Sequence, residues 1–408
     1  MSEFYKPVTD DRRTALTLYI AGIAIYSVMY IPQPFLPGIA IEFGVPPAIA
    51  ALSISVGVAA IALASSWYGP LAETRGGKRV MVRACALLSV PTLLCAVAPS
   101  FAPFLIFRAL QGLLLPGVAS VAVAYIGAQF ARERVGQVVS NYIGATVLGG
   151  MSGRVVSGLI ASQVGWRASF LFFGISTAAT ALLMATALPK DRAQPISTTN
   201  SLRSASRNMW QHLRNRALVG GFAIGGCTFF AFIAVFTYLP FLLNAPPFAL
   251  PQSVVSSAYV AYLAGAIASP LAGRLSARVS RPRLMAGGML LAALGIVCTL
   301  AHWLPLVLMG MLLLCVGMFT TVSSAPAYVN LTATTAKSGA GALYLTFYYA
   351  GATLGSFLPG LAWQSLGWPG VVACALAALA LGLLADGVLC RPVAQASALL
   401  TIVPDDMA

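Results

Sequence analysis

Charged side chains are scarce in this chain of 408 residues. They make up 8% of it, against about 25% in an ordinary soluble domain, while hydrophobic residues make up 59%. Acids are the scarcest group, because 10 Asp and Glu stand against 24 Lys and Arg. This composition excludes a soluble globular domain and indicates a multi-pass, all-α membrane protein.

Several chemical groups are also missing. The chain has 2 His and 7 Cys, with no paired metal-ligand spacing among them, so we expect no metal site and no cofactor. No Gly-Lys-Ser/Thr loop is present to hold ATP phosphates, and no nucleophile–base constellation is visible, so we expect no enzyme activity. A net charge of +14 would suggest nucleic acid in a soluble chain. Here the basic residues stand in loops, and no nucleic-acid partner is predicted.

Long apolar runs are what the chain does have. Twelve of them reach membrane-spanning length, at residues 15–37, 48–68, 81–98, 102–125, 138–161, 168–188, 217–243, 252–272, 284–302, 305–326, 341–364 and 368–389. A polar segment rich in Ser, Arg, Asn and Thr divides them six and six. The predicted organisation is a six-helix bundle at 1–188, a linker at 189–216, a second bundle at 217–389 and a tail at 390–408.

The basic residues predict the orientation. They gather in the loops after the second, fourth and eighth spans, in the linker and near both ends of the chain. Because such loops stay in the cytoplasm, we expect both termini to be cytoplasmic.

Two sequence patterns recur in both halves. The island Gly69 to Arg79 returns 204 positions later from Gly273 to Arg283. Gly153, Gly158 and Gly165-Trp166 return as Gly355, Gly360 and Gly367-Trp368. Parallel six-helix repeats are typical of transporters that bind substrate near the midplane between the repeats.

Three motifs resemble signatures of the major facilitator superfamily. The first is Gly69-x-Leu71-Ala72-Glu73-x-x-Gly76-x-Lys78-Arg79, with Glu where Asp is usual. The others are Leu105-x-x-Arg108-x-x-Gln111-Gly112 and the glycine-rich Gly149-x-x-x-Gly153 with Gly158, in which Arg154 replaces the usual Pro. Gln33-Pro34-x-x-Pro37 and Gly150-Met151-Ser152-Gly153-Arg154 are similar to the bacterial sugar- and drug-efflux branch, in particular YnfM-like proteins.

This resemblance implies a fold and a function. The fold would be two six-helix bundles in a bacterial inner membrane, and the chain would work as a monomer. The function would be alternating-access transport of a small organic compound, as efflux coupled to the proton gradient. The alternative is uptake or exchange of a small organic anion bound by Arg108 and Arg154. A membrane receptor without transport would need no charge inside the spans.

The first motif has two interpretations. In the superfamily it locks the cytoplasmic gate in the outward-open state, which would give gating roles to Gly69, Glu73, Gly76, Lys78 and Arg79. Otherwise it is a basic loop that only fixes topology.

Arg108 and Arg154 lie at similar depth inside the fourth and fifth spans. A charge there costs at least about 2.5 kcal/mol on insertion scales, so each should face a wet cavity or a partner. No carboxylate lies at mid-membrane, and two arginines without acids favour an anionic or neutral polar substrate. The alternative is that backbone carbonyls and packing satisfy each arginine.

Other predicted substrate residues follow from helix number. Family members line the cavity with helices 1, 4, 7 and 10. The candidate set takes Tyr26, Tyr30 and Gln33 from the first span, Gln111 from the fourth, Phe236 from the seventh and Tyr348 from the eleventh. An aromatic surface facing arginines would suit an amphipathic compound. The alternative for any one aromatic residue is packing against lipid or neighbouring helices.

Overall fold

The computed structural model describes residues 11–191, 212–334 and 337–390, and its regular elements are helices. In the first half they are α1 (Asp11–Met29), η1 (Gln33–Phe35), α2 (Leu36–Phe43), α3 (Pro47–Ala50), α4 (Leu52–Arg75), α5 (Gly77–Ala96), α6 (Phe101–Leu114), α7 (Pro116–Gln129), α8 (Arg132–Val164) and α9 (Trp166–Ala187). In the second half they are α11 (Arg216–Asn244), α12 (Gln252–Ser257), η2 (Ala258–Ala261), α13 (Tyr262–Leu275), α14 (Arg281–Cys298), α15 (Leu304–Thr332), α16 (Lys337–Leu366) and α17 (Trp368–Leu389).

Within these ranges, 11 helical segments are long and apolar enough to cross a membrane. They correspond to the predicted spans except for 341–364, where the chain forms the 30-residue helix α16. α16 carries several Gly, Ser, Thr and Tyr residues and packs against α11, α17 and α4, so it completes the second bundle. The all-α membrane fold with two six-helix bundles is therefore confirmed.

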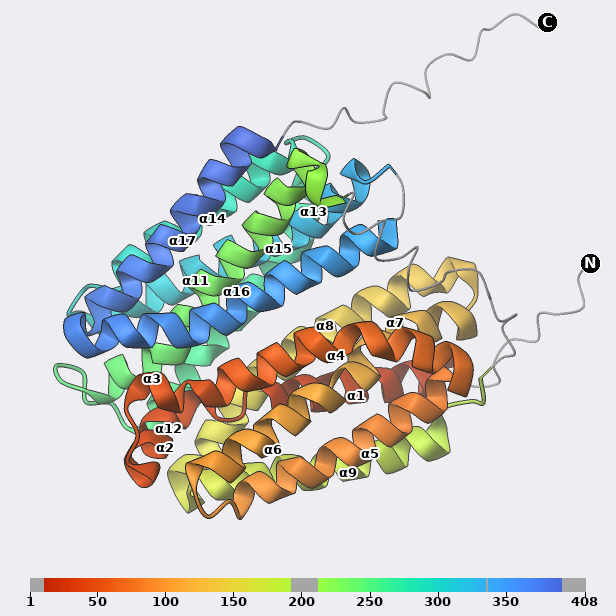
Figure 1. The fold of residues 1–408 in the computed structure, drawn as a ribbon, viewed down its shortest axis with the longest axis horizontal. Helices are drawn as coiled ribbons and strands as arrows, with labels where there is room; N and C mark the ends of the chain where they lie inside the picture. The colour runs from red at the N-terminus through yellow and green to blue at the C-terminus, as the bar shows by residue number, and fades with distance from the viewer. Residues whose placement is uncertain (1–10, 192–211, 335–336, 391–408) are drawn as a thin grey trace, which may run out of the picture.

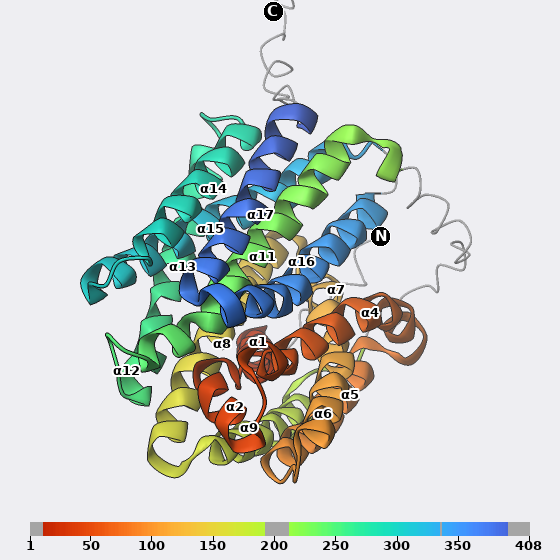
Figure 2. The same cartoon turned by 60° about the vertical axis from the view of Figure 1, so that its left-hand side comes forward.

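The two halves of the chain form two adjacent bundles. Figure 1 shows the first half, red to yellow-green, below the second half, green to blue. In the first bundle α1 packs against α8 and α9, and in the second α11 packs against α15, α16 and α17 (Figure 2). We call the end of the bundles that carries Gly76, Leu188 and Asn215 the linker end, and the end that carries Trp166 and Trp368 the tryptophan end.

Glycines explain why α8 and α16 occupy equivalent places. A Cβ on Gly153 would overlap the backbone of Ser27 on α1, and a Cβ on Gly355 would overlap the backbone of Phe230 on α11. Small residues thus let each helix approach the first helix of its own bundle closely. The repeat found in the sequence corresponds to this shared packing.

Most of the polar island at 69–79 is helical, and the loop within it is shorter than the sequence suggested. α4 continues through Glu73 to Arg75, and α5 begins at Gly77. Leu71, Ala72 and Glu73 are good helix formers, which explains the extension. Gly76 alone makes the turn, with a φ of 87° that favours glycine.

The bundles meet near the tryptophan end. A Cβ on Gly158 of α8 would overlap Ser256 of α12, and a Cβ on Gly360 of α16 would overlap Ala48 of α3. In Figure 1, α3 and α12 lie at the left end of the molecule, where the two bundles come together. At the linker end, by contrast, Glu73 at the end of α4 and Gly341 at the start of α16 are exposed.

Candidate functional site

The first membrane helix breaks between Met29 and Leu36, and the break exposes backbone carbonyls. Pro32 has no N–H to donate to the carbonyl of Val28, its helical acceptor. The N–H of Gln33 donates to Tyr30 at 3.1 Å and so leaves the carbonyl of Met29 without its helical donor. The break therefore creates acceptors that other residues must satisfy.

Arg108 on α6 satisfies both of these acceptors. Its Nη1 donates to the Val28 carbonyl at 3.2 Å and its Nη2 to the Met29 carbonyl at 2.6 Å. Its Nε donates to the Ser53 carbonyl of α4 at 2.7 Å, and Nη1 also donates to Gln111 Oε1 at 2.5 Å. With 1% of its surface exposed, Arg108 joins α1, α4 and α6 inside the first bundle.

Gln111 holds the far side of this network. Its amide nitrogen donates to the hydroxyl of Thr92 on α5 at 2.9 Å, and it is 2% exposed. The structure thus brings the predicted residues Arg108 and Gln111 together, and their hydrogen-bond partners belong to the first bundle.

Arg154 on α8 has a different environment. It is fully buried, its Nε donates to Gln33 Oε1, and its Nη1 donates to the Gly150 carbonyl of its own helix. Its Nη2 has no hydrogen-bond partner among the described residues. One face of the guanidinium lies 3.6 Å from the centre of the Tyr30 ring.

Two tyrosines of the second bundle also contact the guanidinium, and we call Tyr30, Tyr259 and Tyr262 together the tyrosine cage of Arg154. The guanidinium carbon of Arg154 lies 4.6 Å from the ring centre of Tyr262 and 5.8 Å from that of Tyr259. These distances fall within the range of cation–π attraction. Arg154 therefore belongs to the first bundle by sequence but contacts aromatic faces of both.

Gln33 continues the connection across the interface. Its amide nitrogen donates to the hydroxyl of Thr237 on α11 at 3.0 Å, while its oxygen accepts from Arg154. Further links are Ser55 to Ser356 at 2.6 Å and Gln252 to the Pro34 carbonyl at 2.7 Å. All three lie in the parts of the helices nearer the tryptophan end, so they help to close it.

Among the described residues, neither buried arginine has an acidic partner, since no carboxylate lies within ion-pair distance of Arg108 or Arg154. By contrast, the half-buried Arg167 pairs with Glu42 at 2.7 Å. A buried unpaired charge is costly unless hydrogen bonds or a ligand compensate it. Arg108 has four acceptors; Arg154 has two and retains an unused donor atom.

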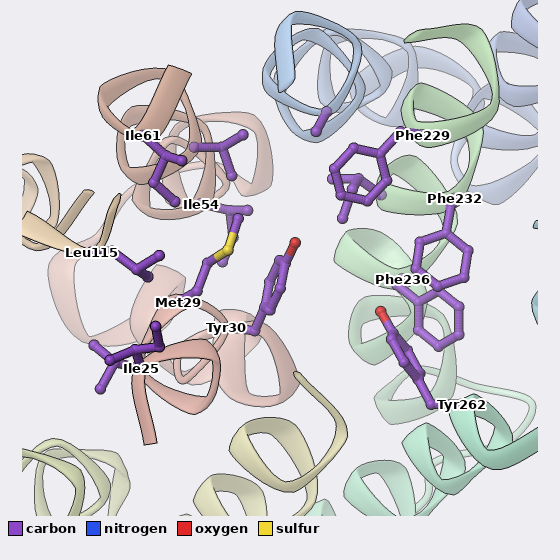
Figure 3. Packing of buried hydrophobic residues seen from close by; sticks show 14 of the residues in the cluster. Ile25, Met29, Tyr30, Ile54, Ile61, Leu115, Phe229, Phe232, Phe236 and Tyr262 are labelled. Carbon is purple, nitrogen blue, oxygen red and sulfur yellow. The ribbon is translucent and has the colours of Figure 1, made fainter. Parts of the chain in front are cut away.

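An aromatic surface of the second bundle faces this cage. We define this aromatic surface by Phe229, Phe236 and Tyr348. Phe229 stacks on Tyr348 with ring centres 3.8 Å apart, and the ring centre of Phe236 lies 5.0 Å from that of Tyr262. Figure 3 shows Tyr30 and Tyr262 on opposite bundles, with their hydroxyl groups turned into the space between them. The hydroxyl of Tyr262 has no partner in the described part of the chain.

Six of the eight predicted substrate residues fall into two groups. Tyr30, Gln33 and Arg154 contact one another, and Phe236 joins them through Tyr262; Arg108 and Gln111 form the separate network in the first bundle. Tyr26 is half-buried and lies next to Tyr349 on α16, one position from Tyr348.

Sequence reasoning missed the contribution of the eighth span. Tyr259 and Tyr262 are three positions apart within it, a spacing that puts two tyrosines on one side of a helix, and this was the available signal. The role of Thr237 could not be seen, because a single threonine in an apolar helix has no distinguishing pattern.

The predicted gating residues lie at the linker end. Glu73 and Arg79 are exposed, and a Cβ on Gly69 would touch nothing within 4 Å. The backbone N–H of Lys78 donates to Asp191 at 2.9 Å, and its ammonium donates to the Leu188 carbonyl. A cavity of about 550 Å³ lies beside this turn, lined by a basic set with one acid: Arg75, Lys78, Arg79, Arg83, Lys190 and Asp191.

Comparison with known proteins gives consistent results. The family model of the Major Facilitator Superfamily matches residues 18–262. The inner membrane transport protein YnfM of Escherichia coli is 35% identical over 94% of this chain and 92% of its own, and the MFS-type transporter YybF of Bacillus subtilis is 30% identical over 94% of both. A bacterial homologue of the human lysosomal transporter Spinster, solved in an inward-facing and unoccupied conformation, superposes with a TM-score of 0.76 at 14% identity, over 94% of this chain and 98% of that one.

Proposed function

This chain belongs to the Major Facilitator Superfamily and is a secondary transporter of a substrate across a membrane, not an enzyme; we propose that it exports a small organic compound from the bacterial cytoplasm by alternating access. The proposal places it as a monomer in the inner membrane, with its linker end and both termini in the cytoplasm. The basic side chains Arg75, Lys78, Arg79 and Arg83 at the linker end support that orientation.

The observation that carries the proposal is the asymmetry of the contact between the bundles. The bonds from Gln33, Ser55 and Gln252 across the interface join the bundles toward the tryptophan end. Aromatic side chains face one another further in, and Glu73 and Gly341 are exposed at the linker end. A protein closed outside and open inside exposes its binding surface to the cytoplasm, the side from which an exporter takes its substrate; the direction itself rests on the resemblance to the efflux branch.

The aromatic surface favours a substrate with an apolar or aromatic body. Phe229 and Tyr348 stack, and Figure 3 shows Tyr30 on the other bundle, facing Phe229. Aromatic rings offer large contact areas with defined geometry.

Transport in membrane vesicles tests the direction. Everted vesicles that carry the protein should accumulate aromatic test compounds when a proton gradient, acidic inside, is imposed, and collapse of the gradient by an ionophore should abolish accumulation. Vesicles without the protein are the control. Accumulation only in right-side-out vesicles would exclude export.

Asp386 on α17 is the proposed proton carrier. It is 8% exposed, it lies where α17 packs against Gly220 of α11, and its Oδ1 has no partner among the described residues. A buried carboxylate near the cytoplasmic side can load and release a proton without contacting the substrate.

A second function, uptake or exchange of a small organic anion, is favoured by one observation, the unpaired buried charge of Arg154. Net accumulation distinguishes uptake from export. Right-side-out vesicles should then accumulate the labelled anion from the outside, whereas an exporter of the same anion would accumulate it only in everted vesicles.

A further inference from the structure

Two buried arginines of similar depth differ in one respect. Arg108 donates to three carbonyls and one amide oxygen, all within the first bundle. Arg154 donates to Gln33 and Gly150 and leaves Nη2 unused in a site that is fully buried. Of the five N–H groups of each guanidinium, Arg108 uses four and Arg154 uses two, so Arg154 has the larger binding capacity left for another group.

We propose that Arg154 binds the negatively charged group of the transported compound, which makes small organic anions with an aromatic body the substrate class. The inference rests on the transport function proposed above. It departs from the alternative drawn from the sequence, in which Arg108 and Arg154 share the anion.

The surroundings of Arg154 fit such a ligand. A carboxylate is an acceptor with two oxygens, and its strongest partners are charged or polarised N–H and O–H donors. Arg154 Nη2 and the Tyr262 hydroxyl are two such donors without partners, and they come from opposite bundles. Phe236 beside Tyr262 and the Phe229–Tyr348 stack are positioned to contact the apolar body.

Binding at this position also affects the closed end of the transporter. Arg154 is held by Tyr30 of the first bundle and by Tyr259 and Tyr262 of the second. A carboxylate at Nη2 lies in the plane of the guanidinium and neutralises the charge that attracts the ring faces, so it weakens these cation–π contacts. Weaker contacts with Tyr259 and Tyr262 loosen the link between the bundles at the tryptophan end, which couples anion binding to opening.

The test uses pairs of compounds that differ only in charge. Phenylacetate is compared with phenylacetamide, and benzoate with benzamide, by thermal unfolding of the purified full-length protein at neutral pH. In the wild type each carboxylate should bind at least about tenfold more tightly than its amide. In Arg154→Gln that preference should fall to about twofold or less, and Arg154→Lys should retain part of it because the positive charge remains.

Arg167→Gln is the matched control, because it removes a half-buried arginine that lies near the tryptophan end and outside the Arg154 site, and it should leave the preference unchanged. If Arg154→Gln does not fold, the comparison of the wild type with Arg154→Lys decides. Equal affinity for carboxylates and amides in the wild type would overturn the inference, as would an unchanged preference in Arg154→Gln.

Flux separates this inference from the proposed function. Export of phenylacetamide as fast as phenylacetate would refute the anion site and leave the export function intact. Selective binding of carboxylates without export in everted vesicles would uphold the anion site and refute export.

Discussion

Replacement of Arg108 by methionine should destabilise the protein severely, whatever it does to transport. Methionine keeps much of the side-chain length but donates nothing, so the carbonyls of Val28 and Met29 lose the donor that replaces their helical one. Each buried acceptor left unsatisfied costs about 1–3 kcal/mol, and removing the buried charge returns part of that cost. We expect a net loss of about 3 kcal/mol.

Arg154→Met is the matched control for this prediction. Arg154 donates to a carbonyl of its own helix that keeps its helical donor and to Gln33, so fewer groups lose their only partner. Its loss of stability should be about 1 kcal/mol or less. Unfolding of both variants in the same detergent, followed by tryptophan fluorescence, gives the comparison. If Arg108→Met were as stable as the wild type yet inactive in transport, Arg108 would act on substrate or coupling, as the sequence suggested.

Three further predictions concern transport. Glu73→Gln should favour the inward-open state, because the proposed lock would lose its charge; labelling of single cysteines at the linker end should rise, and labelling identical to the wild type would count against a gate. Tyr348→Ala should raise KM for aromatic substrates about three- to tenfold, since it removes the stack on Phe229 at 3.8 Å; a KM that does not change would place the pair outside the binding surface. Asp386→Asn should abolish the dependence of flux on a pH gradient while counterflow continues, and gradient-driven transport at the wild-type rate would exclude Asp386 as the carrier.

The fold could be predicted because its signals are local. Apolar length marks each span, and the glycines of α8 and α16 mark the close contacts that repeat in both halves. The linker end of α4 was the exception. The polar residues of the island suggested a loop, but their helix propensity and the single turn at Gly76 carry the helix through Glu73 to Arg75.

The site was predictable only in part. The sequence singled out Arg108 and Arg154 with the same argument, since both are single charges at the same depth. What distinguishes them is the set of partners that each meets in three dimensions. Arg108 meets carbonyls of α1 and α4, whereas Arg154 meets Gln33 and tyrosine rings of both bundles. Tyr259 and Tyr262 were missed for the same reason: nothing in the eighth span indicates which bundle they face.

The break in the first helix explains why Arg108 and Arg154 have different partners. Pro32 leaves the carbonyl of Val28 without its helical donor, and Arg108 of the same bundle donates to it instead. This contact therefore moves as a unit with the first bundle. Gln33, one residue later, turns its side chain toward Arg154 and Thr237, which lie on either side of the interface that alternating access must open. The proline ends helical hydrogen bonding and the glutamine follows it, so one arginine has its contacts within a single bundle and the other has contacts on both sides of the interface. Under the proposed alternating access, only the second set of contacts breaks. It follows that second-site changes which rescue Arg108 variants should lie in the first bundle, whereas those which rescue Arg154 variants should include α11 and η2 of the second.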